Sequence, residues 1–190
     1  MAPAASLFKS VALLLRRVAL LLISFVAHAQ TQCACDVKIS ETLKARECSL
    51  CAEAEKQPPG SGIFFLTDAN PRKPNRTLAL PREHSIGLHR VADLPHATQA
   101  ALWREAIAKA KSLWGENWAI AYNGDRVRTQ CHVHVHIGRI IPGVEWGAFL
   151  EVSSPSEIPV PGVDGYWIHP AGSKLHVHTG EQVTETVLLR

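Results

Sequence analysis

Three histidines at alternate positions of an apolar segment are the feature that most constrains this chain. The segment reads Cys131-His-Val-His-Val-His-Ile137. Because side chains alternate between the two faces of a strand, His132, His134 and His136 would share one face, and the apolar residues would share the other. The apolar face is typical of a core, in which Cys131 would pack as a small buried hydrophobe.

A row of imidazoles is costly to bury unless the ring nitrogens have partners. A solvated edge of histidines is the simplest interpretation, and we favour it least. Two functional interpretations stay open: a metal site formed by the strand, and a histidine nucleophile flanked by supporting histidines. We therefore treat this strand as the candidate functional site.

The rest of the pattern predicts an α+β fold, in which a mostly antiparallel sheet packs against one long helix. Apolar residues at three- and four-residue steps predict that helix from about Pro95 to Trp114, where Gly115 ends it. A short helix is expected to follow Ser40, which can cap it, over residues 41–51. The expected strands cover 63–67, 77–80, 118–122, 130–140 and, near the end, 184–188.

A short alternating segment, 174–178, carries His176 and His178 on one face. We favour a solvated strand face for this pair. A contribution to the candidate site, or a second metal, is the alternative.

Residues 1–29 have the organisation of a secretory signal. Basic residues end at Arg16-Arg17, an apolar run follows, and Ala27-His-Ala29 has the small-residue pattern of a cleavage site. The uninterrupted apolar run is about half of the roughly 20 residues that a membrane-spanning helix needs. We therefore expect an exported protein, periplasmic or extracellular, with no stable membrane span after cleavage.

The net charge of +3 comes from this leader. The chain has 20 Lys and Arg against 17 Asp and Glu, and the leader holds Lys9, Arg16 and Arg17 but no acid. The remainder is formally neutral, so it has no surplus of positive charge to neutralise phosphates. No nucleic-acid partner is expected.

All five cysteines follow the leader, at positions 33, 35, 48, 51 and 131. Export favours disulfides. An odd count, however, leaves at least one thiol free or bound to a metal. Cys48 and Cys51 are three residues apart and can face one zinc ion, with His84 as a candidate third ligand. Disulfide and zinc both stay open.

Taken together, these residues resemble the histidine triad (HIT) superfamily. The segment 132–137 matches its motif of histidines separated by apolar residues, although Gly138 stands where the motif has a further apolar residue. The strand that ends Pro81-Arg-Glu-His84, the long helix, the turn at Asn123-Gly124 and the early Cys-x-x-Cys follow in the family's order.

The resemblance covers about residues 48–139. It implies a HIT-like fold with an antiparallel sheet of about five strands. The implied organisation is a signal peptide (1–29), an N-terminal lead-in (30–47), a HIT-like domain (48–140) and a C-terminal extension (141–190).

The resemblance also implies an enzyme that acts on a nucleotide or nucleotide conjugate at its α-phosphate. His134 would attack phosphorus and form a covalent nucleotidyl intermediate, and His136 would stabilise or orient the phosphate. One ring nitrogen of His134 must then be held as N–H, with a backbone carbonyl as the expected acceptor. Asn123, Thr129 and Gln130 are the expected substrate contacts.

In zinc-containing members of the family, the ligands correspond to Cys48, Cys51, His84 and His132. The resemblance therefore implies a structural zinc ion as the cofactor, because four protein ligands fill its coordination sphere. Relatives are often two-fold dimers, which makes a homodimer possible here.

Two other functions stay open. Arg128-Thr129-Gln130 resembles the run before the histidines in CDP-diacylglycerol pyrophosphatases, so a CDP-alcohol or CDP-diacylglycerol pyrophosphatase is the alternative enzyme. Those enzymes typically lack the first triad histidine, which this chain has. The other alternative is a non-catalytic metal- or ligand-binding module, for which we expect more than one metal ion per chain and no turnover.

Overall fold

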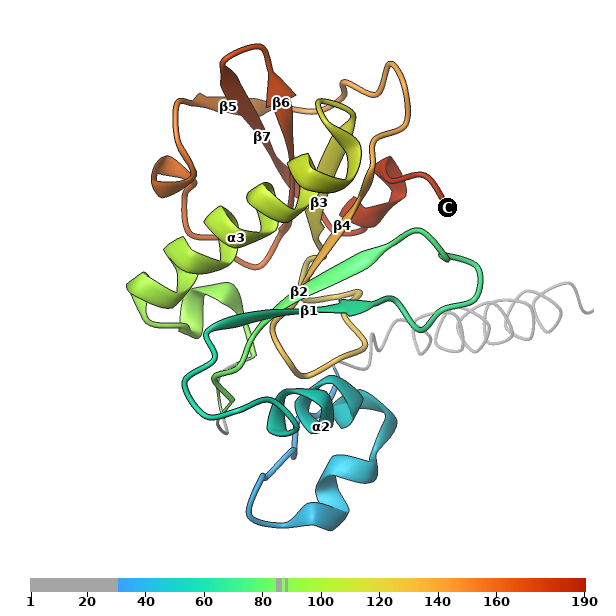
Figure 1. Cartoon of the computed structure of the whole chain (residues 1–190), viewed down its shortest axis with the longest axis vertical. Helices are drawn as coiled ribbons and strands as arrows, with labels where there is room; N and C mark the ends of the chain where they lie inside the picture. Colours follow the sequence, from blue (N-terminus) through green and yellow to red (C-terminus); the bar gives the residue numbers. More distant parts are fainter. Residues whose placement is uncertain (1–30, 85–86, 88) are drawn as a thin grey trace, which may run out of the picture.

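The computed structural model describes residues 31–84, 87 and 89–190 (Figure 1). The leader expected at residues 1–29 lies outside this part. No helix within the described residues is long and apolar enough to cross a membrane.

One antiparallel sheet of seven strands organises the described chain, with the order β1-β2-β4-β3-β6-β7-β5. The expected α+β class with an antiparallel sheet is confirmed. The strands are β1 (Ile63–Thr67), β2 (Thr77–Pro81), β3 (Trp118–Tyr122), β4 (Val135–Arg139), β5 (Phe149–Val152), β6 (Gly165–Ala171) and β7 (Lys174–Glu181).

Helix α3 (His96–Trp114) lies across one face of this sheet (Figure 1). Its buried side, which includes Leu102 and Ala106, packs with Ile120 of β3 and Ile137 of β4 in the main core. Val133 and Val135 belong to the same core, which confirms the apolar face expected for the triad segment. The triad histidines therefore face away from α3.

The opposite face is covered by the end of the chain. The 3-10 helix η6 (Thr184–Val187) replaces the strand expected over 184–188. Val187 and Leu188 pack on Ala121 of β3 and Trp167 of β6. The end of the chain thus lies on the face that carries the histidines.

Residues 141–190, which the sequence assigns to an extension, supply three of the seven strands. β6 pairs with β3, β7 pairs with β6, and β5 pairs with β7 at the edge. This segment is therefore an integral part of the sheet, which is larger than the expected one.

The triad strand is shorter than expected. β4 begins at Val135, because the segment before it turns toward the N-terminal lead-in instead of pairing in the sheet. The Cys131 backbone N–H donates to the Glu47 carbonyl at 2.8 Å. His132 and His134 therefore precede the strand, and only His136 lies within it.

The expected helix over 41–51 is divided. Two 3-10 turns, η2 (Ser40–Lys44) and η3 (Arg46–Cys48), lead into α2 (Ser49–Glu55), because Ala45 between the turns has an extended backbone. Two further 3-10 turns are η4 (Val91–Asp93) and η5 (Pro155–Glu157).

Candidate active site

Two disulfides tie the N-terminal lead-in to the domain. Cys33 is bonded to Cys131, and Cys35 is bonded to Cys48. Cys51 is buried and is the one free cysteine of the described chain. Two expectations are therefore corrected: Cys48 carries no thiolate to bind zinc, and Cys131 is a disulfide partner instead of a packed thiol.

The other three expected ligands do come together. One ligand atom from each of Cys51, His84 and His132 lies within 4.8 Å of the others. The Nε2 atom of His132 is 2.7 Å from the Pro81 carbonyl oxygen. A carbonyl only accepts, so Nε2 carries the proton and Nδ1 keeps its lone pair.

The unpartnered atoms of this group point to a cation. His132 Nδ1 and both ring nitrogens of His84 are buried, and none has a hydrogen-bond partner within the described chain. Burial lowers the pKa of His132 to about 4 and also lowers the pKa of His84, so both rings are neutral near pH 7. Neutral imidazoles beside a thiol are ligands that transition metals prefer, and this group can hold a metal ion.

His134 is held in one tautomer. Its Nδ1 atom is 2.9 Å from the His132 carbonyl oxygen, so Nδ1–H donates and Nε2 presents a lone pair. The expected backbone acceptor for His134 is confirmed. Burial lowers the pKa of His134, which keeps the ring neutral. An oriented, neutral imidazole is the form that can act as a nucleophile.

A cavity of about 690 Å³ opens beside this ring. Its volume lies in the range of small-molecule sites. The lining contains the histidines His134 and His136 and the three expected substrate contacts. It also contains basic, acidic and apolar side chains, which are Arg46, Lys73 and Arg128, then Glu53, Asp68 and Glu185, and then Leu50, Leu66 and Leu78.

His136 lies beside the candidate nucleophile. The rings of His134 and His136 meet edge-on, with their centroids 5.0 Å apart. Nδ1 of His136 is 3.8 Å from a carboxylate oxygen of Asp68 and 3.9 Å from one of Glu185. Burial lowers the pKa of His136, so a neutral ring faces these two carboxylates.

Glu185, from η6, joins the site to two cations. Its Oε2 atom is 2.5 Å from Lys73 Nζ and 2.6 Å from an Arg76 nitrogen. Burial alone would raise the pKa of Glu185. The cations Lys73 and Arg76 outweigh burial and hold the pKa of Glu185 below its ordinary value, so the carboxylate is ionised. The end of the chain is thus fixed at the cavity by an ionic network.

Removing Arg76 should destabilise the fold. Arg76 is 3% exposed and donates to the carbonyls of Glu185 and Leu188, both at 2.9 Å, as well as to the Glu185 carboxylate. Arg76→Met leaves Lys73 beside the Glu185 carboxylate but removes the donor to two backbone carbonyls, so it is expected to lower the free energy of unfolding by about 3 kcal/mol. Urea unfolding measures this, with the exposed Arg72→Met as the matched control. Equal midpoints for the two variants would contradict the assigned role.

The expected substrate contacts line the cavity, but two of them are also used within the protein. The Asn123 Oδ1 atom accepts hydrogen bonds from the backbone N–H groups of Thr184 and Glu185 at 3.0 and 3.3 Å. Asn123 therefore positions η6. The amide of Gln130 bonds the Ser49 hydroxyl and the Arg46 carbonyl, at 2.9 and 3.0 Å. Thr129 is exposed at the rim.

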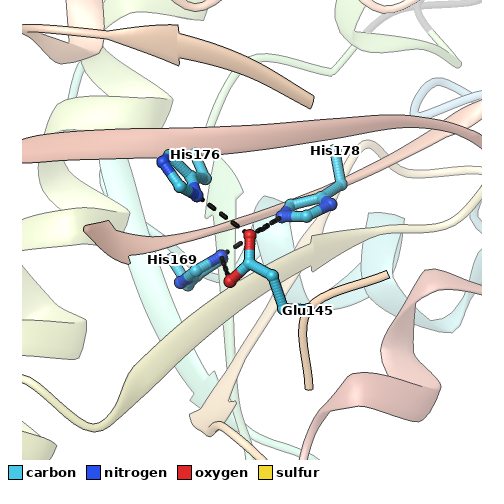
Figure 2. A group of neighbouring side chains, drawn as sticks. All are labelled: Glu145, His169, His176 and His178. Atoms are coloured by element: carbon cyan, nitrogen blue, oxygen red, sulfur yellow. Dashed lines mark hydrogen bonds and ion pairs between the residues drawn. The ribbon is translucent and has the colours of Figure 1, made fainter. Parts of the chain in front are cut away.

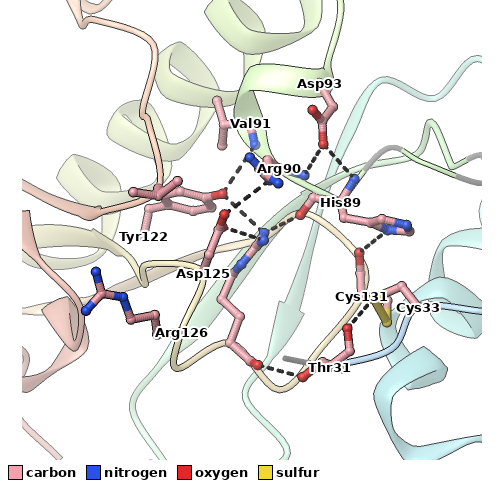
Figure 3. Close-up of polar contacts among 12 residues, drawn as sticks. Thr31, Cys33, His89, Arg90, Val91, Asp93, Tyr122, Asp125, Arg126 and Cys131 are labelled. Carbon is pink, nitrogen blue, oxygen red and sulfur yellow. Dashed lines mark hydrogen bonds and ion pairs between the residues drawn. A yellow bond between two sulfur atoms is a disulfide. The ribbon is translucent and has the colours of Figure 1, made fainter. Parts of the chain in front are cut away.

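Arg128 organises the loop before the triad. Its guanidinium donates to the His89 carbonyl and, at 2.7 and 3.2 Å, to Asp125 Oδ1 and the Tyr122 hydroxyl. Figure 3 shows His89, Tyr122 and Asp125 converging in this network, with the Cys33–Cys131 disulfide nearby. The loop is thereby tied to β3 and to the lead-in.

Sequence reasoning missed Asp68, Lys73, Arg76 and Glu185. One signal was present for the first three: they lie in or next to the turn between β1 and β2, and β2 pairs with β4 beside His136. Glu185 had no such signal, because it is 109 positions from Arg76 in the sequence and meets it only in the folded chain.

A scan against protein-family models finds no match to this chain, and a search of curated proteins likewise finds none.

Proposed function

We propose that this protein hydrolyses or transfers a nucleotide or nucleotide conjugate at its α-phosphate, with His134 as the nucleophile. One observation carries the proposal: the His132 carbonyl fixes Nδ1–H of His134, which leaves the Nε2 lone pair of a neutral ring beside a cavity of about 690 Å³.

The reaction would proceed in two displacements. The Nε2 lone pair forms a bond to phosphorus while the bond from phosphorus to the leaving group breaks, and the leaving group departs with that electron pair. Water, or another acceptor, then attacks phosphorus, the phosphorus–nitrogen bond breaks, and the acceptor's proton is released. His136 would position or stabilise the phosphate, which is the main task in phosphoryl transfer.

The basic side chains around the cavity support a phosphate-bearing substrate. Lys73 and Arg128 line it, and Arg46 lies near its α2 side. Part of the charge of Lys73 already compensates Glu185. Arg128 is likewise paired with Asp125, and the acidic side chains of Glu53, Asp68 and Glu185 also line the cavity. The formal charge of the lining is therefore balanced, and the basic side chains would contact phosphate oxygens individually.

The apolar lining keeps a CDP-alcohol or CDP-diacylglycerol pyrophosphatase as the second candidate. Leu50, Leu66 and Leu78 form an apolar part of the same cavity. Such a surface suits a nucleobase or the first carbons of a lipid. Turnover of a CDP-lipid, compared with turnover of nucleotide conjugates that carry no lipid, distinguishes these two candidate functions.

We further propose zinc as the metal at Cys51, His84 and His132. Zinc would fix His132, whose backbone carbonyl orients His134, and with three protein ligands it would keep a fourth position open. The protein's own residues supply three ligands. Cys48 would become a thiolate only after reduction of its bond to Cys35.

Export of the protein remains our proposal for its location. Two disulfides among five cysteines are typical of proteins that fold in an oxidising compartment. A periplasmic or extracellular site of action follows if the leader is cleaved, and the homodimer that the family resemblance implies stays a prediction.

The test is product analysis combined with trapping of the intermediate. The purified protein is incubated with a nucleoside phosphoramidate, a dinucleoside polyphosphate, a nucleotide sugar and a CDP-lipid. Samples are quenched in alkaline denaturant, because the phosphorus–nitrogen bond of a nucleotidyl-histidine is labile in acid, and are then digested for mass spectrometry at alkaline pH. We expect release of a nucleoside monophosphate and a nucleotidyl adduct on the peptide that contains His134.

Turnover of the CDP-lipid alone would favour the second candidate. No product from any substrate, together with no adduct, would overturn the proposal and leave a non-catalytic binding module as the better account.

A further inference from the structure

A second cluster of histidines lies on β6 and β7, away from the proposed nucleophile. It comprises His169 of β6, His176 and His178 of β7, and Glu145 from the loop that follows β4. One ligand atom from each residue lies within 4.8 Å of the others. Figure 2 shows the Glu145 carboxylate facing ring nitrogens of all three histidines.

The distances around the carboxylate are short. Oε1 of Glu145 is 3.0 Å from His176 Nδ1 and 3.4 Å from His178 Nε2, and Oε2 is 3.2 Å from His169 Nε2. The two Nε2 atoms of His169 and His178 are 3.2 Å apart. Four potential ligand atoms therefore converge on one small volume.

The outer nitrogens of two rings fix their tautomers. His178 Nδ1 is 2.9 Å from the Trp146 carbonyl oxygen, and His169 Nδ1 is 3.0 Å from the Pro170 carbonyl oxygen. A carbonyl can only accept, so both Nδ1 atoms carry protons. Both Nε2 atoms point toward each other and toward the Glu145 carboxylate. A shared proton or a metal cation can fill the space between them, and three imidazoles beside a carboxylate are a donor set that a divalent metal ion fits.

Bonds from the outer nitrogen to a backbone carbonyl are also the usual support of histidines that bind metals. The site is rigid, because His178 is 1% exposed and stacks on Trp167 with their centroids 3.6 Å apart. The expectation of a solvated strand face is therefore wrong for His178. A solvated histidine pair would need neither the bonds to backbone carbonyls nor the packing on Trp167.

This cluster is separate from the catalytic cavity. Directly opposed residues of neighbouring strands share a face, and His136, Ala121, Trp167 and His178 form one such row across β4, β3, β6 and β7. Three strand spacings separate its ends, or about 14 Å. Val187 of η6 packs over the middle of the row. An ion in the cluster would therefore not touch a substrate held by His134.

We propose that Glu145, His169, His176 and His178 form a second metal site, which binds a divalent transition-metal ion of the zinc class. Three imidazoles and one carboxylate supply four protein ligands, which fill a tetrahedral shell and leave no open position for a substrate. The ion would fix the loop that carries Glu145 against the β6–β7 hairpin. An active enzyme could then also hold two metal ions per chain. The number of bound ions alone would therefore not distinguish an enzyme from a non-catalytic metal-binding module.

The experiment counts Zn²⁺ ions in chelator-treated protein by equilibrium dialysis. Cys51→Ala serves as the common background, because it removes the thiol of the other candidate site. We expect one Zn²⁺ per chain in this background and a rise in the melting temperature with Zn²⁺. Adding Glu145→Gln or His176→Ala should weaken binding at least about 10-fold and reduce the rise in melting temperature at the same Zn²⁺ concentration.

These two positions are chosen because they are the most exposed of the four, so their variants should fold. The matched control is Glu151→Gln, an exposed carboxylate on β5 that lies 3.8 Å from the opposite nitrogen of His176. The Cys51→Ala/Glu151→Gln protein should bind Zn²⁺ with the same affinity as the Cys51→Ala protein. No binding at micromolar Zn²⁺ in the Cys51→Ala background would overturn the proposal, and so would unchanged affinity in both ligand variants.

Discussion

Replacing His134 with alanine is expected to lower kcat by at least about 10³-fold, because the variant has no group that can form the covalent intermediate. The fold should be retained, since the ring bonds only a backbone carbonyl within its own segment and otherwise faces the cavity. Steady-state kinetics on the substrate identified by product analysis measures the change. The nucleotidyl adduct should also disappear from the mass spectrum.

Two comparisons make this result specific. His96→Ala changes an exposed histidine at the start of α3 and should leave kcat unchanged. His136→Ala should slow turnover but still yield an adduct, because the nucleophile is intact. A His134→Ala protein that keeps kcat within about tenfold of the wild type would contradict the covalent mechanism.

The sequence predicted most accurately those features that depend on residues close together in the chain. The two-residue period of the triad segment identified which side chains face the core, because alternation depends only on neighbouring positions. The three- and four-residue spacing of apolar residues located α3 for the same reason. Both features survive in the structure even though β4 begins later than expected.

The sequence predicted least where distant segments meet. Pairing of β6 with β3 joins two strands that are far apart in the chain, and the Pro- and Gly-rich stretch between them resembles a tail. Glu185 reaches the cavity only because η6 folds back over β3 and β6. The sequence identified two members of the second histidine cluster, His176 and His178, because they lie on one strand. It did not identify Glu145 and His169, which come from other segments.

Cysteine pairing had the same difficulty. Five cysteines allow many pairings, and spacing alone cannot choose among them. A CxxC pair suggested that Cys48 and Cys51 act together, whereas the fold brings Cys48 to Cys35 and Cys51 to the two histidines. Which cysteines are paired therefore depends on the three-dimensional path of the lead-in.

Loss of the Cys33–Cys131 disulfide is expected to cause the largest fall in stability. The bond joins residues 98 positions apart. Constraining so long a loop in the unfolded chain contributes on the order of 4 to 5 kcal/mol in the chain-entropy model. Cys131 directly precedes His132, so its loss should also loosen the carbonyl that orients His134. The Cys33→Ala/Cys131→Ala protein should therefore unfold at a lower urea concentration and turn over more slowly.

The second disulfide provides the matched control for this prediction. Cys35 and Cys48 are 13 positions apart, so Cys35→Ala/Cys48→Ala removes two cysteines but releases a much shorter loop, worth about 3 kcal/mol in the same model. Reduced wild-type protein should be less stable than either double variant, because it lacks both constraints. If the two double variants unfold at the same urea concentration and the reduced wild type matches the oxidised form, neither bond stabilises the fold. The lead-in would then contribute only through contacts such as that between Cys131 and Glu47.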